Sequence, residues 1–136
     1  MNEKLRQLLL RHEGKRLMPY VDTVGKVTIG VGRNLTDNGI TECECEAMFF
    51  HDIDMAHSSL MIFFPDCDGW AEARENALID MMFNMGARRF GGFKKMIAAV
   101  RIGDWAGAAR EMLDSSWAIQ LPTRVSELAK MVKTGR

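Results

Sequence analysis

A stretch near the start of the chain cannot form a regular helix, and it separates a small β-rich part from a helical remainder. Four helix-breaking residues fall between positions 17 and 32: Pro19, Gly25, Gly30 and Gly32. Val24-Gly25 is a candidate turn, and residues 27–31 are rich in strand formers. The pattern predicts a hairpin or a three-stranded sheet within about residues 14–40.

Helical patterns flank this stretch on both sides. Asn2 can cap a first helix over about residues 3–12. Thr41 and Glu44 have the spacing of a capping box, which predicts the start of a long helix over about residues 42–63. A helix of about 20 residues spans ~30 Å and can connect two lobes. Its inner face is expected to consist of Cys45, Met48, Phe49, Ile53, Ala56 and Leu60.

The rest of the chain is predicted to be helical, so the fold class is α+β. The expected segments are residues 69–85, 93–100, 104–113, 116–119 and 122–132. Asp104 is a candidate cap, and Pro122 suits the first turn of the last helix.

The length of the chain, 136 residues, predicts a single domain. We expect a β-rich lobe at about 14–40 and a connecting helix at about 42–63. Residues 1–12 and about 65–136 would form a larger helical lobe. A cleft between the lobes is the expected ligand site, because clefts of this kind are preferred for binding.

Composition and charge exclude several classes of protein. Apolar residues make up 47% of the chain and charged residues 26%, which is typical of a soluble globular protein. The longest run without a charged side chain, residues 55–65, is too short to span a bilayer, and the N-terminus lacks the apolar core of a signal peptide. The net charge is zero, which disfavours a nucleic-acid-binding module.

The cysteines and histidines do not predict a metal site. Three cysteines without an export signal indicate reduced thiols. Cys43, Cys45, His51 and His57 lie on one predicted helix but face at least three directions, whereas zinc ligands must converge. We therefore expect no metal and no organic cofactor.

Two carboxylates and a hydroxyl near the β-rich stretch are candidate catalytic groups. Glu13 ends the first helix, whereas Asp22 and Thr28 lie on or beside the sheet. One acid that protonates a leaving oxygen and one carboxylate that handles water are sufficient to hydrolyse a glycosidic bond. On the residues alone, a solvated glutamate at a helix end is the more frequent situation.

Three motifs resemble those of a known family. Residues 9–32 read LLRHEGKRLxxYxDTxGxxTIGVG, residues 83–86 read Phe-Asn-Met-Gly, and residues 117–124 read WxxQxPxR, beginning at Trp117 and ending at Arg124. In this order they resemble the phage-type lysozymes, glycoside hydrolase family 24. The connection at residues 34–39 is shorter than in the longest members, which predicts a small β-rich lobe.

The resemblance implies two lobes joined by a long helix and cleavage of the β-1,4 bond between N-acetylmuramic acid and N-acetylglucosamine in peptidoglycan. It assigns Glu13 as the general acid, Asp22 as the second carboxylate and Thr28 as a water-holding hydroxyl, with inversion at the anomeric carbon. Arg124 matches a family arginine that approaches the general acid. Phe83 is either core or cleft wall, and Asn84 is a candidate saccharide hydrogen-bond donor.

The resemblance also implies a biological setting, that of an endolysin from a phage or prophage. We expect a monomer that acts on peptidoglycan, does not bind nucleic acid and does not insert stably into membranes. It would be made in the host cytoplasm and reach the wall through a holin-type membrane hole. The alternatives are a non-catalytic saccharide-binding module, a lysozyme domain of a phage tail, and a hydrolase of chitin-like polymers.

Overall fold

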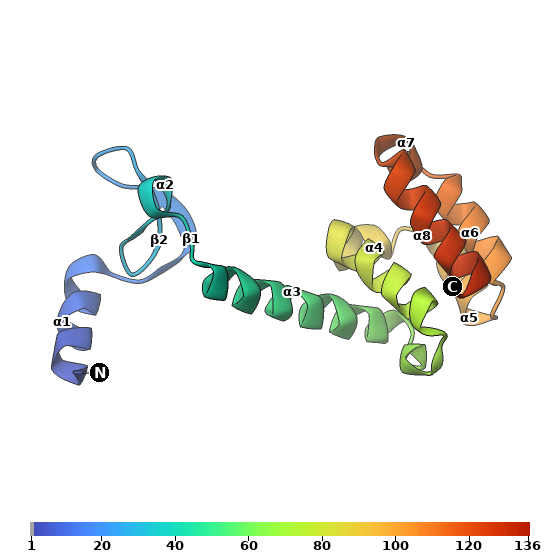
Figure 1. Ribbon diagram of the computed structural model, residues 1–136, viewed down its shortest axis with the longest axis horizontal. Coiled ribbons are helices and arrows are strands. Elements are labelled where there is room, and N and C mark those ends of the chain that lie inside the picture. Colours follow the sequence, from blue (N-terminus) through green and yellow to red (C-terminus); the bar gives the residue numbers. More distant parts are fainter. Residues whose placement is uncertain (1) are drawn as a thin grey trace. The chain divides into compact units, whose positions relative to one another are not determined.

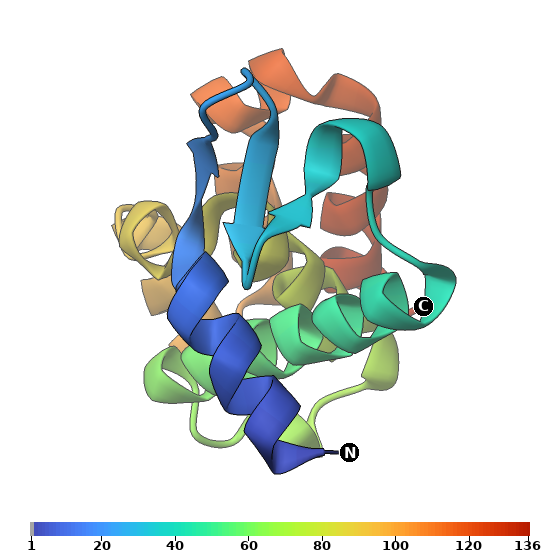
Figure 2. The same ribbon diagram turned by 90° about the vertical axis from the view of Figure 1, so that its left-hand side faces the viewer.

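A computed structural model describes residues 2–136, which divide into two compact units, Met1–Ala47 and Met48–Arg136. The first unit contains α1 (Glu3–Glu13), β1 (Arg16–Val21), β2 (Val27–Gly30), β3 (Arg33–Asn34), α2 (Leu35–Asn38) and the start of α3 (Glu42–Phe63). In both ribbon views the sheet and α2 follow the C-terminal end of α1 (Figures 1 and 2). Helices and strands together confirm the predicted α+β class.

Local hydrogen bonds set the two ends of α1. The side chain of Asn2 accepts a hydrogen bond from the Leu5 N–H, which confirms the predicted cap. The Gly14 N–H donates to the Leu10 carbonyl, and the helix ends at Glu13, one residue later than predicted.

The predicted sheet is a three-stranded antiparallel sheet in the order β1-β2-β3. Tyr20 in β1 pairs with Thr28, and Thr28 pairs on its other side with Asn34 in β3. The turn between β1 and β2 passes through Gly25 at φ 83°, a left-handed conformation that glycine adopts without steric cost. The Gly25 N–H donates to the Asp22 carbonyl at 3.1 Å.

The capping box at the start of α3 is present and is joined to the sheet. Glu44 accepts from the Thr41 N–H at 2.8 Å, and its own N–H donates to the Thr41 hydroxyl at 3.2 Å. Arg33 of β3 also donates to both Glu44 carboxylate oxygens, at 2.8 and 2.6 Å. One glutamate thus fixes the helix start and ties it to β3.

This arrangement predicts acid-sensitive stability. The hydrogen bonds from Arg33 and from the Thr41 N–H lower the pKa of Glu44 to about 2, compared with ~4.3 for a free glutamate. Because the folded-state pKa is the lower one, the stabilisation is complete above pH ~4.3 and is lost as the pH falls toward about 2. We expect the thermal midpoint of Glu44→Gln to lie below that of the parent at neutral pH and to converge with it in acid.

Glu42→Gln is the matched control for this pH series, because Glu42 lies in the same helical turn without the contact to Arg33. Thermal melts of the three proteins between about pH 2.5 and about pH 7 measure the effect. A parent-to-variant gap that stays constant across this range would contradict the prediction.

The second unit is a helical bundle. After α3 it contains the 3₁₀ turn η1 (Cys67–Gly69), α4 (Glu72–Phe90), α5 (Lys94–Arg101), α6 (Trp105–Leu113), α7 (Ser116–Gln120) and α8 (Pro122–Thr134). Figure 1 shows α5 to α8 gathered beside α4. Asp104 caps α6 and Pro122 opens α8, as predicted. The largest fully buried side chains are Trp117, Phe64, Phe90, Leu60, Leu78, Met81, Met96, Met112, Val125, Val132 and Cys67.

Two predictions about the helices need correction. The segment expected to stop before Gly86 is broken there, at φ 79° and ψ 165°, but helical structure resumes as far as Phe90. On the expected inner face of α3, only Ala56 and Leu60 are buried and Ile53 is half-buried, whereas the other three residues are exposed. Only the C-terminal half of α3 contributes to the core of the second unit.

All three cysteines are free thiols, with Cys43 and Cys45 exposed and Cys67 buried. No helix within residues 2–136 combines the length and the apolar character that a membrane span requires.

Candidate active site

Glu13 lies at the exposed C-terminal end of α1, against the backbone of the turn that follows β2. A Cβ atom placed on Gly32 would come within 2.7 Å of Glu13 Oε2 and 3.0 Å of its Cδ. Gly32 also has φ 67°. The carboxylate therefore occupies space that is available only because residue 32 has no side chain.

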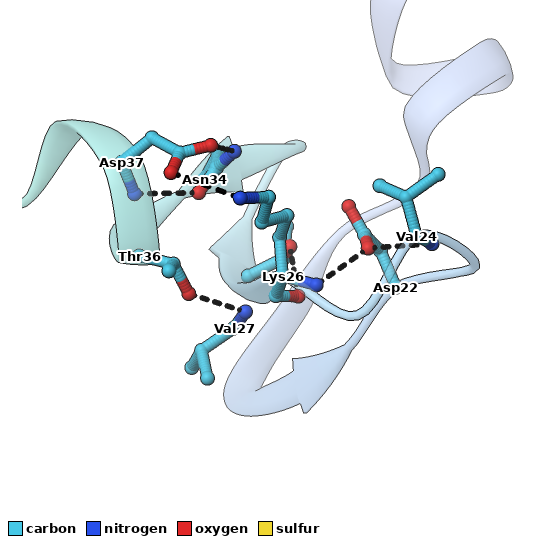
Figure 3. A network of polar contacts seen from close by, with 8 residues as sticks. Asp22, Val24, Lys26, Val27, Asn34, Thr36 and Asp37 are labelled. Atoms are coloured by element: carbon cyan, nitrogen blue, oxygen red, sulfur yellow. Dashed lines mark hydrogen bonds and ion pairs between the residues drawn. The ribbon is translucent and has the colours of Figure 1, made fainter.

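Asp22 directly follows β1 and is half-buried. Its Oδ1 accepts hydrogen bonds from the N–H groups of Val24, at 3.0 Å, and Lys26, at 2.8 Å, as Figure 3 shows. Within the described part of the chain, Oδ2 has no hydrogen-bond partner. One carboxylate oxygen therefore organises the turn, and the other remains free to accept a hydrogen bond.

Thr28 lies in the central strand and is 4% exposed. Its hydroxyl donates to the Lys26 carbonyl at 3.0 Å. Because this bond uses the hydroxyl proton, the lone pairs of Oγ1 remain available to accept from another donor.

The main chain of Lys26 joins these two residues. Its N–H donates to Asp22 Oδ1, and its carbonyl accepts both from the Asp22 N–H, at 2.9 Å, and from the Thr28 hydroxyl. The Lys26 ammonium group contacts Asp37 of α2 at 3.1 Å (Figure 3). The Lys26 main chain thus holds both Asp22, whose Oδ2 is not hydrogen-bonded to any described residue, and Thr28 of β2. Asp22 Oδ2 and Thr28 Oγ1 can each accept a hydrogen bond from a water molecule.

Asn84 and Trp117 form a polar contact within the second unit. The indole N–H of the fully buried Trp117 donates to Asn84 Oδ1 at 2.8 Å. This bond orients the exposed amide of Asn84 and leaves its NH₂ group to donate elsewhere.

The WxxQxPxR segment joins α7 and α8 to α4. Arg124 donates through Nε to Asp80 at 2.8 Å, and its Nη2 lies 2.7 Å from the same carboxylate oxygen. Gln120 accepts from Arg89 at 2.8 Å. Each of these contacts crosses from the end of the chain back to α4.

Phe83 is 44% exposed, so it is not a core residue of the second unit. Its ring meets the Phe49 ring edge to face, with centroids 6.1 Å apart. It lines a cavity of about 250 Å³ between α3 and α4, together with Asp52 and Met55.

Comparisons with known proteins identify the family of this chain. The family described as Phage lysozyme matches residues 10–131. The chain belongs to the phage lysozyme family.

Two relatives that match this chain over nearly their whole length are the probable T4-type lysozymes 1 and 2 of Dictyostelium discoideum. They are 28% and 29% identical over 167 aligned positions, which cover 99% of this chain and 96% of each relative. Because 167 positions exceed the 136 residues of this lysozyme, the relatives contain segments that it lacks. The pre-baseplate central spike protein Gp5 of Enterobacteria phage T4 is 31% identical over 98% of the chain, but the match covers only 28% of Gp5.

As a phage lysozyme, the protein is a glycoside hydrolase with a muramidase-like activity on peptidoglycan. Among the predicted site residues, Asp22 and Thr28 both form hydrogen bonds with the main chain of Lys26, and the Glu13 carboxylate lies beside Gly32. The other three, Phe83, Asn84 and Arg124, belong to the helical unit.

Two positioning residues of this lysozyme were not predicted from the sequence: Lys26, which holds Asp22 and Thr28, and Asp80, which holds Arg124. Lys26 acts through its main chain, which leaves no side-chain signal in the sequence. Asp80 lies 44 residues before Arg124. Helical spacing relates side chains that are three or four residues apart, so it cannot reveal such a pair.

Proposed function

We propose that this lysozyme is an inverting muramidase that cleaves the β-1,4 bond between N-acetylmuramic acid and N-acetylglucosamine. The observation that carries the proposal is the geometry of Asp22, whose Oδ1 is engaged by two N–H groups while Oδ2 has no partner among the described residues. An inverting enzyme requires a carboxylate that positions and deprotonates a water molecule, and Asp22 Oδ2 suits that role.

Thr28 and Glu13 complete the proposed chemistry. The Thr28 hydroxyl, already donating to the Lys26 carbonyl, can accept a hydrogen bond from the same water. A covalent nucleophile would not need this second acceptor. Glu13 donates its proton to the leaving oxygen, and inversion requires that the two carboxylates lie ~6.5–9.5 Å apart so that the water fits between them.

Phe83, Asn84 and Arg124 are the proposed substrate-binding residues. The Asn84 NH₂ group is free to donate to a saccharide because Trp117 holds its oxygen. The exposed ring of Phe83 offers an apolar face to a sugar. Arg124 keeps a guanidinium group at the surface of α8 through its contact with Asp80.

The stereochemistry of the product tests the mechanism. With defined muropeptide oligomers, NMR spectra recorded before mutarotation should show the α-anomer as the first reducing end, because the β-linkage is inverted. A first-formed β-anomer, or a glycosyl ester on Asp22 trapped by mass spectrometry, would overturn the inverting mechanism and leave the lysozyme activity intact.

The setting in which the enzyme meets the wall is a separate proposal. We propose that it acts as a monomeric endolysin, is made in the host cytoplasm and passes through a holin-type hole. The similarity to Gp5 favours a second candidate, a lysozyme domain of a phage tail.

Expression of the chain alone in bacteria tests this setting. We expect a normal growth curve while the protein accumulates, and rapid loss of turbidity once chloroform opens the membrane. Cells that produce Glu13→Gln to the same level are the control and should keep their turbidity. Lysis of untreated cells by the parent would contradict the requirement for a membrane hole.

A further inference from the structure

Three potential metal ligands converge in the second unit, outside the residues assigned to catalysis. They are His57 of α3 and the consecutive residues Cys67 and Asp68 of η1, whose ligand atoms all lie within 4.8 Å of one another. His57 Nε2 lies 2.9 Å from Asp68 Oδ1, and Cys67 Sγ lies 4.0 Å from the same oxygen. The turn after α3 brings these residues together across ten positions of the sequence.

Two of the three separations lie near those that one metal ion requires, although His57 and Asp68 are joined directly by a hydrogen bond in this structure. Tetrahedral zinc with ordinary bond lengths places a nitrogen and an oxygen ligand ~3.4 Å apart, and a sulfur and an oxygen ligand ~3.6 Å apart. The observed separations of 2.9 and 4.0 Å differ from these by about half an ångström or less. Binding requires Asp68 Oδ1 to shift from His57 toward Cys67, and the His57 and Cys67 ligand atoms, which lie at most 4.8 Å apart, to come within ~3.5 Å of each other.

Access from solvent and negative charge at this position also favour a cation. Cys67 is fully buried, His57 is half-buried, and Asp68 is exposed, so the cluster has one open side through which an ion can enter. Glu75 of α4 adds a carboxylate oxygen 3.6 Å from His57 Nε2. The negative charges of Asp68, Glu75 and Asp66 near Cys67 attract a dication.

We propose that His57, Cys67 and Asp68 bind one Zn²⁺ ion. The combination of imidazole, thiolate and carboxylate ligands suits zinc better than magnesium or calcium, which prefer oxygen ligands alone. On binding, the Cys67 thiol releases its proton to solvent, and the neutral His57 ring coordinates through Nε2. The ion links the end of α3 to η1 and thereby stabilises the fold.

This site differs from the set of cysteines and histidines that lie on α3 alone, namely Cys43, Cys45, His51 and His57. His57 belonged to that set, but Cys43 and Cys45 are exposed near the other end of α3. The cysteine that meets His57 follows α3, because the chain turns back at η1.

Cobalt spectroscopy of the full chain tests the proposal. The background is the Cys43→Ser/Cys45→Ser variant, which removes the two exposed thiols. One equivalent of Co²⁺ should produce a thiolate-to-cobalt charge-transfer band and the strong visible bands of tetrahedral coordination, and Zn²⁺ should abolish both. Zinc should also raise the thermal midpoint of this protein.

Single variants in the same background identify the ligands. Asp68→Asn and His57→Gln should each weaken Zn²⁺ binding by roughly tenfold or more, within the range seen when metal-site partners are removed. His51→Gln is the matched control, because His51 lies exposed on the same helix, and it should bind like the background. Cys67→Ala should lose the charge-transfer band.

Because Cys67 is fully buried, its variant can fail to fold for unrelated reasons. Asp68→Asn changes only an exposed side chain and keeps the test decisive. Absence of the charge-transfer band in the folded background protein, or equal zinc affinity in Asp68→Asn, His57→Gln and His51→Gln, would overturn the proposal.

Discussion

Replacement of Glu13 by glutamine is expected to abolish peptidoglycan hydrolysis in a protein that still folds. Glutamine keeps the shape of the side chain but has no proton to transfer to the leaving oxygen. Loss of general-acid catalysis typically costs ~10²–10⁴-fold in rate. Turbidity loss of a peptidoglycan suspension, at equal concentrations of folded enzyme, measures the effect.

Glu3→Gln is the matched control for this experiment. Glu3 is also an exposed glutamate of α1, and within residues 2–136 its carboxylate has hydrogen bonds only with the side chains of Arg6 and Gln7. Its replacement should leave activity unchanged, because exposed pairs of this kind contribute little. If Glu13→Gln retained activity within a few-fold of the parent, the assignment of Glu13 as general acid would be wrong.

The second large effect is expected from Gly32→Ala. A Cβ atom at this position would lie 2.7 Å from Glu13 Oε2, so the carboxylate must move away from its present place. Displacement of a catalytic group by about 1 Å can cost about 10²-fold in rate. We therefore expect a loss of roughly that size in the peptidoglycan assay, although residue 32 transfers no proton itself.

Gly30→Ala separates this effect from backbone strain. Gly30 has φ 69°, close to the 67° of Gly32, but a Cβ atom there would meet nothing within 4 Å. Both variants should lower the thermal midpoint similarly, because a non-glycine residue in the left-handed region costs about 1–2 kcal/mol. Equal activity losses in the two variants would show that strain, and not the Glu13 contact, is responsible.

Local features of the fold were predictable because their interactions join residues close in sequence. The Asn2 cap, the Thr41–Glu44 capping box and the start of α8 at Pro122 all agree with the structure. The glycines around the sheet also marked the break in helical structure correctly. In contrast, more residues of α3 were predicted to be buried than are buried in the structure. Periodicity shows which residues share a face of a helix, but it does not show how much of that face another element covers.

The sequence by itself determined the α+β class, the capped helices, the β-rich stretch and, through its motifs, the family and the candidate residues Glu13, Asp22 and Thr28. These depend on short-range hydrogen bonds and on residue order. Only the tertiary structure decided which distant groups meet: Arg124 with Asp80 across 44 positions, and Trp117 with Asn84 across 33. It also brought His57 to Cys67 and Asp68. These long-range contacts depend on how the turns and the packing of the helices bring distant segments of the chain together. Spacing between neighbouring residues in the sequence does not encode this.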